Sequence, residues 1–425
     1  MRRRSVVAAT LCLLSVAACS DSVAPARTSR TALSPASDAD LDRSGGRGVF
    51  NRYVAIGTSV SMGWQSDGVI AATQETSWPE QLAELAHRSI TQPYIDGTGC
   101  RSPLIAPLAL GRRLSGEGAG QNPATLSCSP LRADVVLPVQ NLAINAATTA
   151  DALFTTPENT TDASNRQLIG RVLQPGMTQV SSMIAQNPKL VSVELGGNEV
   201  LNARSGIVIP DVTVARLETW APLYDQVLDQ VGSVAKEAVI VGLIDDVASF
   251  PAFRRGDEMW QQRFLFAGAF HVTVSDDCAG SPNLLFVPVV VPTAVGTAAA
   301  LGSATLHCAG GGPGTQDFIL TPGETGAVNA LLAQMNAHIR GEAERRGFAY
   351  FALQELYGRG DIKGPFNPIA LMTSLEPYGP YISLDGVHPT AAGARVLAEA
   401  AARALDARYD HHILAQAAPL IAANQ

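Results

Sequence analysis

The stretch YVAIGTSVSMG, residues 53–63, begins as a run of apolar residues and then changes abruptly to small and polar ones. Its first part, Tyr53–Ile56, predicts a buried strand, and Gly57-Thr58-Ser59 predicts a tight turn where that strand reaches the surface. A tight turn requires small residues, which is a sufficient structural explanation. A serine held at a strand end can also act as a nucleophile, so the rest of the chain must decide between the two interpretations.

Apolar runs and helical patterns alternate along the rest of the chain. Further strands are expected at 135–144, 190–195, 238–244 and 348–353, and helices at 78–88, 177–186, 212–234 (kinked at Pro222), 325–346 and about 391–407. The helix that ends at residue 346 has a clear start, because Thr321 can cap it and Glu324 completes a capping box. This alternation predicts an α/β fold with a parallel sheet covered on both faces. Ligands of such sheets bind beyond the carboxyl ends of the strands, which is where Ser59 lies.

The N-terminus has the pattern of an export signal. Arg2-Arg3-Arg4 precedes a short apolar stretch that ends at Val16-Ala17-Ala18-Cys19. The stretch is too short to span a bilayer and is typical of a signal peptide. Its end resembles the bacterial lipobox, so we expect cleavage before Cys19 and lipidation of Cys19. The alternative is ordinary cleavage after an A-x-A-like site, which would release a soluble exported protein.

The expected organisation is a leader (1–19), a flexible tether (20–50), a folded domain (51–409) and a C-terminal tail (410–425). In the tail, His411 and His412 are expected to be exposed to solvent. Without the leader, 27 basic residues face 38 acidic ones, a formal charge of −11. This charge argues against a nucleic-acid partner or a patch for anionic membranes. No other segment has the pattern of a transmembrane helix, so acyl chains on Cys19 would be the only membrane anchor. They would hold the protein to the bacterial cell envelope, at the outer membrane in a Gram-negative cell.

Two Gly/Pro-rich segments, about 97–130 and 254–317, interrupt the alternation, and each contains a pair of cysteines. An even number of cysteines in an exported chain suggests disulfides, and the simplest pairing joins sequence neighbours: Cys100 with Cys128, and Cys278 with Cys308. Their spacing does not match a zinc site. We expect both segments to be insertions near the mouth of the site, able to shape or cover it.

Two further segments carry residues suited to acyl transfer. The run at 190–195 ends at Gly196-Gly197-Asn198, where an asparagine amide could face a developing oxyanion and the glycines would let substrate approach. Taken alone, Gly-Gly-Asn is more often a turn. Near the C-terminus, Asp385 stands three residues before His388 and could accept the imidazole Nδ1–H, which would leave Nε2 free as a base. Taken alone, this spacing is also a weak signal.

The three signals in this order resemble the SGNH (GDSL-type) hydrolase family. NLAINAATTADAL (141–153) is similar to the second block of the family, QNPKLVSVELGGNEVLNA (186–203) to the third, and SLDGVHPTAAGARVLAEA (383–400) to the last. The resemblance covers about residues 51–409 and implies a flavodoxin-like three-layer α/β/α sandwich. Four blocks in order are much more specific than any one of them.

The resemblance implies a role for each matching residue. Ser59 would be the nucleophile, His388 the general base and later acid, and Asp385 the residue that orients His388. The oxyanion would be held by the backbone N–H groups of Ser59 and Ala146 and by the side-chain amide of Asn198. Gly57, Thr58 and Gly196 would support this arrangement.

The chain departs from the family pattern at two positions. Thr58 replaces the aspartate of Gly-Asp-Ser, and its hydroxyl could replace part of that supporting carboxylate. Ala146 replaces a glycine of the second block, where a methyl group would narrow the pocket unless the φ angle is negative. The chain also lacks the Gly-x-Ser-x-Gly elbow, because Ser61 occupies the second glycine position, which disfavours an ordinary α/β-hydrolase.

We therefore expect a serine ester hydrolase that requires no cofactor or metal. Short-chain carboxylic esters, lipid esters and O-acetylated glycans are all open as substrates. The alternative is a weak or inactive member that serves as a binding module of the cell envelope, which Thr58 and Ala146 would favour. Asp245-Asp246 has no ligand-spaced partner and is interpreted as a polar turn, and Asp67-Gly68 first as a turn and only second as a substrate contact.

Overall fold

A sheet of four parallel strands forms the centre of the molecule in the computed structural model, which describes residues 47–312 and 314–415. Across the sheet the strands are β1 (Tyr53–Gly57), β2 (Leu190–Glu194), β3 (Glu237–Gly242) and β9 (Ala349–Ala352). β1 and β2 are buried along their whole length, because helices cover both faces of the sheet and strands in such a position are apolar throughout. The predicted parallel sheet is confirmed.

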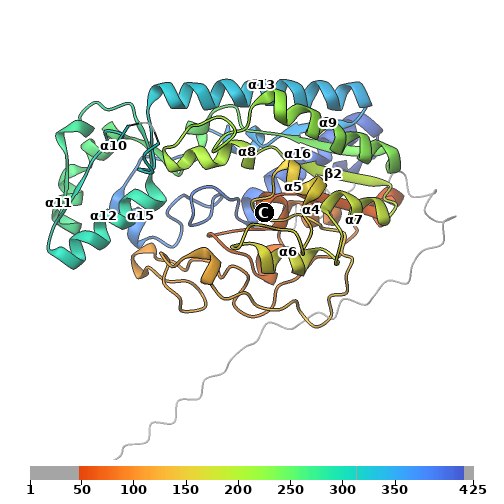
Figure 1. Cartoon of the computed structure of the whole chain (residues 1–425), viewed down its shortest axis with the longest axis horizontal. Coiled ribbons are helices and arrows are strands. Elements are labelled where there is room, and N and C mark those ends of the chain that lie inside the picture. The colour runs from red at the N-terminus through yellow and green to blue at the C-terminus, as the bar shows by residue number, and fades with distance from the viewer. Residues whose placement is uncertain (1–46, 313, 416–425) are drawn as a thin grey trace, which may run out of the picture.

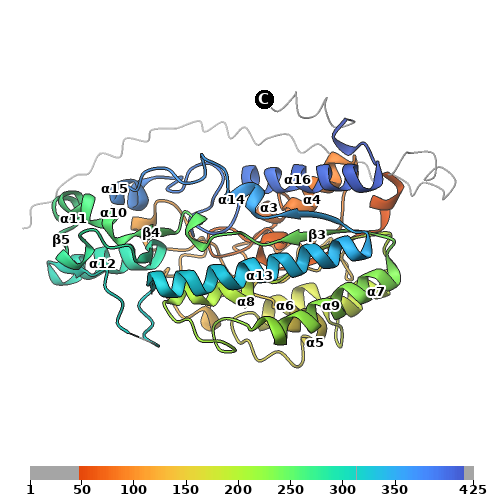
Figure 2. The same cartoon turned by 90° about the horizontal axis from the view of Figure 1, so that it is seen from above.

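Helices form a layer on each side of the sheet (Figures 1 and 2). One layer contains α4 (Trp78–Leu85) and α16 (Ala391–Tyr409), which pack against each other. The other contains α5 (Thr149–Phe154), α7 (Gln179–Ala185), α9 (Leu217–Val234) and α13 (Pro322–Arg346). The fold is therefore the expected three-layer α/β/α sandwich.

Most predicted elements occur within a few residues of their expected bounds. The capping box of α13 is present, with Thr321 Oγ1 accepting the N–H of Glu324 and the Glu324 carboxylate accepting the N–H of Thr321. α9 begins at residue 217 instead of 212, and it continues through Pro222.

The prediction of a strand at 135–144 is wrong. Only Asn141 forms a bridge to β1, although the backbone around it follows that edge strand through the Gln140 carbonyl and the N–H groups of Leu142 and Ile144. The pairing goes no further because two N–H groups have other acceptors: that of Gly57 donates to Gln179 Oε1 at 3.0 Å, and that of Gln140 donates to the carbonyl of Thr91.

The second insertion forms a separate group of small elements at one end of the molecule (Figure 1). Strands β4 (Phe253–Arg255), β6 (Leu284–Phe286) and β8 (Ile319–Leu320) make an antiparallel sheet, and β5 (Val272–Val274) pairs with β7 (Ala304–Leu306). Its helices are α10 (Gly256–Gln261), α11 (Arg263–Phe270) and α12 (Val287–Leu301), and α15 (Pro368–Thr373) packs against α11.

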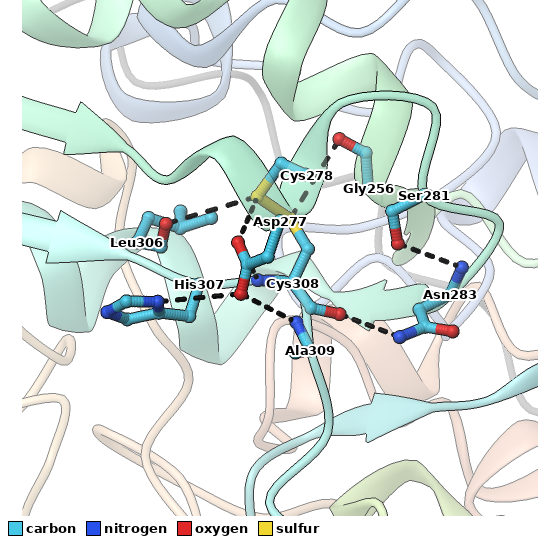
Figure 3. The surroundings of a disulfide bond; sticks show 9 residues. All are labelled: Gly256, Asp277, Cys278, Ser281, Asn283, Leu306, His307, Cys308 and Ala309. Atoms are coloured by element: carbon cyan, nitrogen blue, oxygen red, sulfur yellow. Dashed lines mark hydrogen bonds and ion pairs between the residues drawn. A yellow bond between two sulfur atoms is a disulfide. The ribbon is translucent and has the colours of Figure 1, made fainter.

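Both predicted disulfides are present. Cys100 bonds to Cys128 and Cys278 to Cys308, each closing a loop of about 30 residues. Figure 3 shows the second of them beside Asp277, whose carboxylate accepts the backbone N–H groups of Cys308 and Ala309. In the chain-entropy account, a disulfide that closes a loop of this length stabilises the folded protein by about 3–4 kcal/mol.

Two predictions for the ends of the chain need correction. The tether was expected to reach residue 50, but Arg47–Arg52 forms a 3₁₀ helix and Phe50 is buried in the core. His411 was expected to be solvated, but it is buried and its Nε2 lies 2.6 Å from a carboxylate oxygen of Glu237. The signal peptide, the lipidation of Cys19 and the tether up to residue 46 lie outside the described residues. Among the described helices, none combines the length and apolar character that a membrane crossing requires.

Candidate active site

The turn after β1 places Ser59 at the carboxyl edge of the sheet. Ser59 is the first residue of α2 (Ser59–Met62) and is almost fully buried. Only glycine fits at position 57, because a Cβ there would lie 2.7 Å from the Oγ of Ser61 and 3.1 Å from the carbonyl oxygen of Glu194. The small residues of the opening stretch are thus needed for the close packing of this turn.

His388 and Asp385 lie next to Ser59 in space. His388 Nε2 is 2.9 Å from Ser59 Oγ, and His388 Nδ1 is 2.9 Å from Asp385 Oδ2. Because the Asp385 carboxylate accepts a hydrogen bond at Nδ1, that nitrogen carries the proton and Nε2 accepts from the serine hydroxyl. The three sequence-predicted residues are therefore joined in one chain of hydrogen bonds.

The surroundings of Asp385 keep it ionised. Burial alone would raise its pKa, but the charge of His388 and hydrogen bonds from His388 and Asp67 lower the pKa of Asp385 to about 2. Oδ1 accepts the backbone N–H groups of Val387 and His388, and Oδ2 accepts that of Asp67 in addition to the imidazole. These bonds fix the carboxylate in the orientation that the imidazole needs.

Three free hydrogen-bond donors surround the same cleft. Within the described part of the chain, the backbone N–H groups of Ser59 and Ala146 have no acceptor. Asn198, the first residue of α8 (Asn198–Leu201), donates one amide hydrogen to the carbonyl of Ala147 at 2.8 Å, which holds the side chain and leaves its second hydrogen free. All three residues line the cleft that contains Ser59 and His388. Free donors around a buried hydroxyl are what an oxyanion site requires.

Ala146 and Gly196 both adopt positive φ angles, of 60° and 108° respectively. Ala146 therefore has the backbone conformation that a glycine would adopt without strain, and its methyl group is a genuine departure from the family pattern. At Gly196, the positive φ angle explains why the third block needs a glycine at this position, two residues before Asn198.

Glu194, at the end of β2, is a site residue that the sequence analysis missed. Its carboxylate accepts four hydrogen bonds from the turn that carries Ser59, from the backbone N–H and the hydroxyl of both Thr58 and Ser61. Trp78 Nε1 donates to the Ser61 hydroxyl, which fixes that hydroxyl as a donor to Glu194. Burial raises the pKa of Glu194, and the four hydrogen bonds oppose this shift. A carboxylate from the neighbouring strand thus binds the turn that carries Ser59, and the sequence signal for it was a charged residue within the apolar run LVSVEL.

Asp67 does more than form a turn. Its carboxylate bonds to Arg101 at 2.7 Å and to Arg113 at 2.6 Å, and its N–H donates to Asp385. The prediction that placed the turn first was therefore incomplete, because Asp67 connects the first insertion to the loop that carries His388. Sequence spacing gives no signal for these contacts. By contrast, Asp246 caps a short turn through the N–H of Ala248, as expected for a polar strand-end turn.

Two cavities meet at Ser59 and His388. The inner pocket has a volume of about 60 Å³ and is lined mainly by apolar side chains, among them Val60, Leu243, Phe250 and Tyr357. The outer cleft offers about 540 Å³ and is lined by polar and charged residues and by both insertions. Asn198 lies on the wall of both cavities.

This fold and this site define the class of ester-bond hydrolases. The chain belongs to the GDSL-like lipase/acylhydrolase family, whose model matches residues 53–401. A comparison with curated proteins finds no match.

Solved structures that align with the chain include an acetylxylan esterase from Geobacillus stearothermophilus, with 12% sequence identity over 83% of this chain and 93% of that chain and a TM-score of 0.33. A chain from Parabacteroides merdae described as a GDSL-like lipase aligns with 10% identity over 83% of this chain and 94% of its own, also with a TM-score of 0.33.

Proposed function

We propose that this enzyme is a serine esterase that hydrolyses carboxylic esters through an acyl-enzyme. The observation that carries the proposal is the unbroken chain of hydrogen bonds from Ser59 Oγ through His388 to Asp385. In this mechanism Ser59 Oγ attacks the ester carbonyl carbon while its proton passes to His388 Nε2. The oxyanion forms beside the free donors of Ser59, Ala146 and Asn198.

The remaining steps use the same groups. His388 gives its proton to the departing alcohol, and the acyl group stays on Ser59. A water molecule then loses a proton to His388 and attacks the acyl carbon, and the carboxylic acid leaves as the proton returns to Ser59. Asp385 stabilises the imidazolium in both halves of the reaction.

The inner pocket supports a preference for short acyl groups. A volume of about 60 Å³ is far below the roughly 300–1,000 Å³ of typical ligand pockets, which suits a short acyl chain better than a long lipid chain. A series of p-nitrophenyl esters from two to twelve carbons tests this. We expect kcat/KM to fall beyond six carbons, and a rise with chain length would overturn the preference.

A fluorophosphonate probe separates the enzyme from an inactive binding module. The domain that begins at residue 47 should be labelled in the wild type and not in Ser59→Ala, and only the wild type should hydrolyse p-nitrophenyl butanoate. No labelling and no turnover between pH 5 and 10 would favour a binding module. Turnover that survives Ser59→Ala would reject this nucleophile.

Export and lipid anchoring through Cys19 are part of the proposal. They are supported by the basic leader, the short apolar stretch and the sequence before Cys19. Cys19→Ala should move the protein from the membrane fraction to the soluble fraction, and an unchanged distribution would contradict the anchor.

A further inference from the structure

An arginine without a partner lies between the two cavities of the active site. Arg204 belongs to the 3₁₀ turn Asn202–Ser205, which directly follows the short helix that begins with Asn198. It lines the inner pocket and the outer cleft, together with Ser59 and His388 in both. Within residues 47–312 and 314–415, its guanidinium makes no hydrogen bond or ion pair.

The two carboxylates whose charges act on Arg204, those of Asp67 and Asp385, already bind other groups. Asp67 binds Arg101 through one oxygen and Arg113 through the other. Asp385 is bound by the imidazole of His388 and by backbone N–H groups. Neither carboxylate is therefore free to form an ion pair with Arg204.

The third carboxylate of the cleft, Asp162, is also occupied. One of its oxygens accepts the N–H and hydroxyl of Ser164, and the other accepts the side-chain amide of Asn165. The Nε atoms of Arg101 and Arg113 are buried without an acceptor in the described part of the protein. The cleft thus has unused cationic donors and no unused carboxylate.

The guanidinium of Arg204 is available to a ligand, because it faces both cavities and has no partner among the described residues. Although Arg204 keeps part of its surface exposed, the protein around it removes water and lowers its pKa, and the charges of Asp67 and Asp385 only oppose this. The planar fork of a guanidinium matches the oxygens of a carboxylate or a phosphate.

We propose that Arg204 binds an anionic group, a carboxylate or a phosphate, on the alcohol part of the ester. This inference rests on the proposed function and names its substrate class: esters of a short acyl group with an alcohol that carries a negative charge. The charge belongs to the alcohol part, because the inner pocket is apolar and its acidic residue, Glu194, would repel an anion there. The outer cleft instead offers Arg101 and Arg113 beside Arg204.

A matched set of esters tests the charge preference. We would measure kcat/KM for phenyl butanoate, 3-carboxyphenyl butanoate and the butanoate ester of 3-hydroxyphenyl phosphate, with wild type, Arg204→Gln and Arg204→Lys. Arg403→Gln is the control, since Arg403 is an exposed arginine on α16 that does not line either cavity of the active site. The two charged esters distinguish a carboxylate from a phosphate as the preferred group.

Arg204→Gln should lower kcat/KM about 10–100-fold for the preferred anionic ester, the equivalent of one or two charge-assisted hydrogen bonds, and no more than about threefold for phenyl butanoate. Arg204→Lys should keep part of the preference, and the control variant should keep all of it. If Arg204→Gln lowers kcat/KM equally for charged and neutral esters, Arg204 has a structural role. If it lowers kcat/KM for neither, Arg204 does not contact the substrate. Either result overturns the proposal.

Binding without turnover separates this inference from the proposed function. In Ser59→Ala protein, benzoate or phenyl phosphate should bind in calorimetric titrations at least about tenfold more tightly than in Ser59→Ala/Arg204→Gln, while benzyl alcohol should not distinguish the two. If this binding depends on Arg204 but the wild-type protein hydrolyses none of the esters, the anion site stands and the esterase is rejected. Hydrolysis without any dependence on Arg204 would reject the anion site alone.

Discussion

The imidazole Nε2 of His388 lies 2.9 Å from the Oγ of Ser59, although 329 residues separate them in the chain. The two residues meet because Ser59 follows the carboxyl end of β1 and His388 lies in the loop that precedes α16, at the same edge of the parallel sheet. The proton transfer proposed for the first step needs this distance and no rearrangement of the loops.

Ser59 and His388 should act as one unit. Ser59→Ala and His388→Ala should each lower kcat by at least about 10³-fold, and the double variant should be no slower than either single one, because the groups depend on each other. Initial rates with p-nitrophenyl butanoate measure this. Additive losses in the double variant would contradict a shared proton transfer, and thermal unfolding checks that each variant is folded.

Removal of the Asn198 amide should affect the transition state more than substrate binding. Asn198→Ala is expected to lower kcat by about 10²–10³-fold with little change in KM, because the amide meets negative charge only when the carbonyl is attacked. Asn198→Asp keeps the size of the side chain and removes the donor, so it should be at least as slow. A variant that changed only KM would assign Asn198 to substrate binding.

The hydrogen bonds to Glu194 should stabilise the nucleophile turn. Thr58→Val removes a hydroxyl that donates to this buried carboxylate, and we expect a loss of about 1.5–3 kcal/mol in the free energy of unfolding. Thr58→Ser retains the hydroxyl and should stay close to wild type. Denaturant unfolding measures both, and equal stability of Thr58→Val and Thr58→Ser would show that the contact contributes nothing.

Ala146→Gly should not destabilise the protein. The positive φ angle of Ala146 costs about 1–2 kcal/mol in a residue with a Cβ, which offsets the greater flexibility of glycine in the unfolded chain. Ala150, within α5, is a matched control where glycine should cost about 1 kcal/mol. Equal losses at the two positions, measured by thermal unfolding, would contradict the strain at Ala146.

The low pKa of Asp385 should make the stability of the fold depend on pH in the acid range. Its pKa is about 2 in the folded protein and roughly 4 in an unfolded chain, so it stabilises the fold fully above pH 4, and this contribution disappears as the pH falls toward 2. The difference of about two pKa units corresponds to roughly 2–3 kcal/mol. The stability gap between wild type and Asp385→Asn should therefore narrow between pH 5 and pH 2, and a gap that stays constant with pH would show that the carboxylate charge is not the cause.

Patterns local in the chain were sufficient for much of the fold. The apolar runs at β1, β2, β3 and β9 and the capping box of α13 involve neighbouring residues, so periodicity and cap chemistry predict them directly. The strand expected at 135–144 did not form because the N–H groups of Gly57 and Gln140 donate to Gln179 and Thr91 instead of extending the ladder with β1, and no local pattern predicts those contacts. The environment of His411 could not be predicted, because its partner Glu237 is 174 residues away.

The sequence by itself determined most of the strands and helices, because each of them leaves a local pattern in the chain. It identified Ser59, Asn198, Asp385 and His388 only through the order of several blocks that resemble a family, and it offered the pairing of the cysteines only as the simplest arrangement. Only the tertiary structure decided that Glu194 binds the turn that carries Ser59, that Asp67 binds two arginines and donates its N–H to Asp385, and that Arg204 is left without a partner among the described residues. The physical reason is that a hydrogen bond or an ion pair depends on distances of about 3 Å between side chains from different elements, and their spacing along the chain carries no record of those distances.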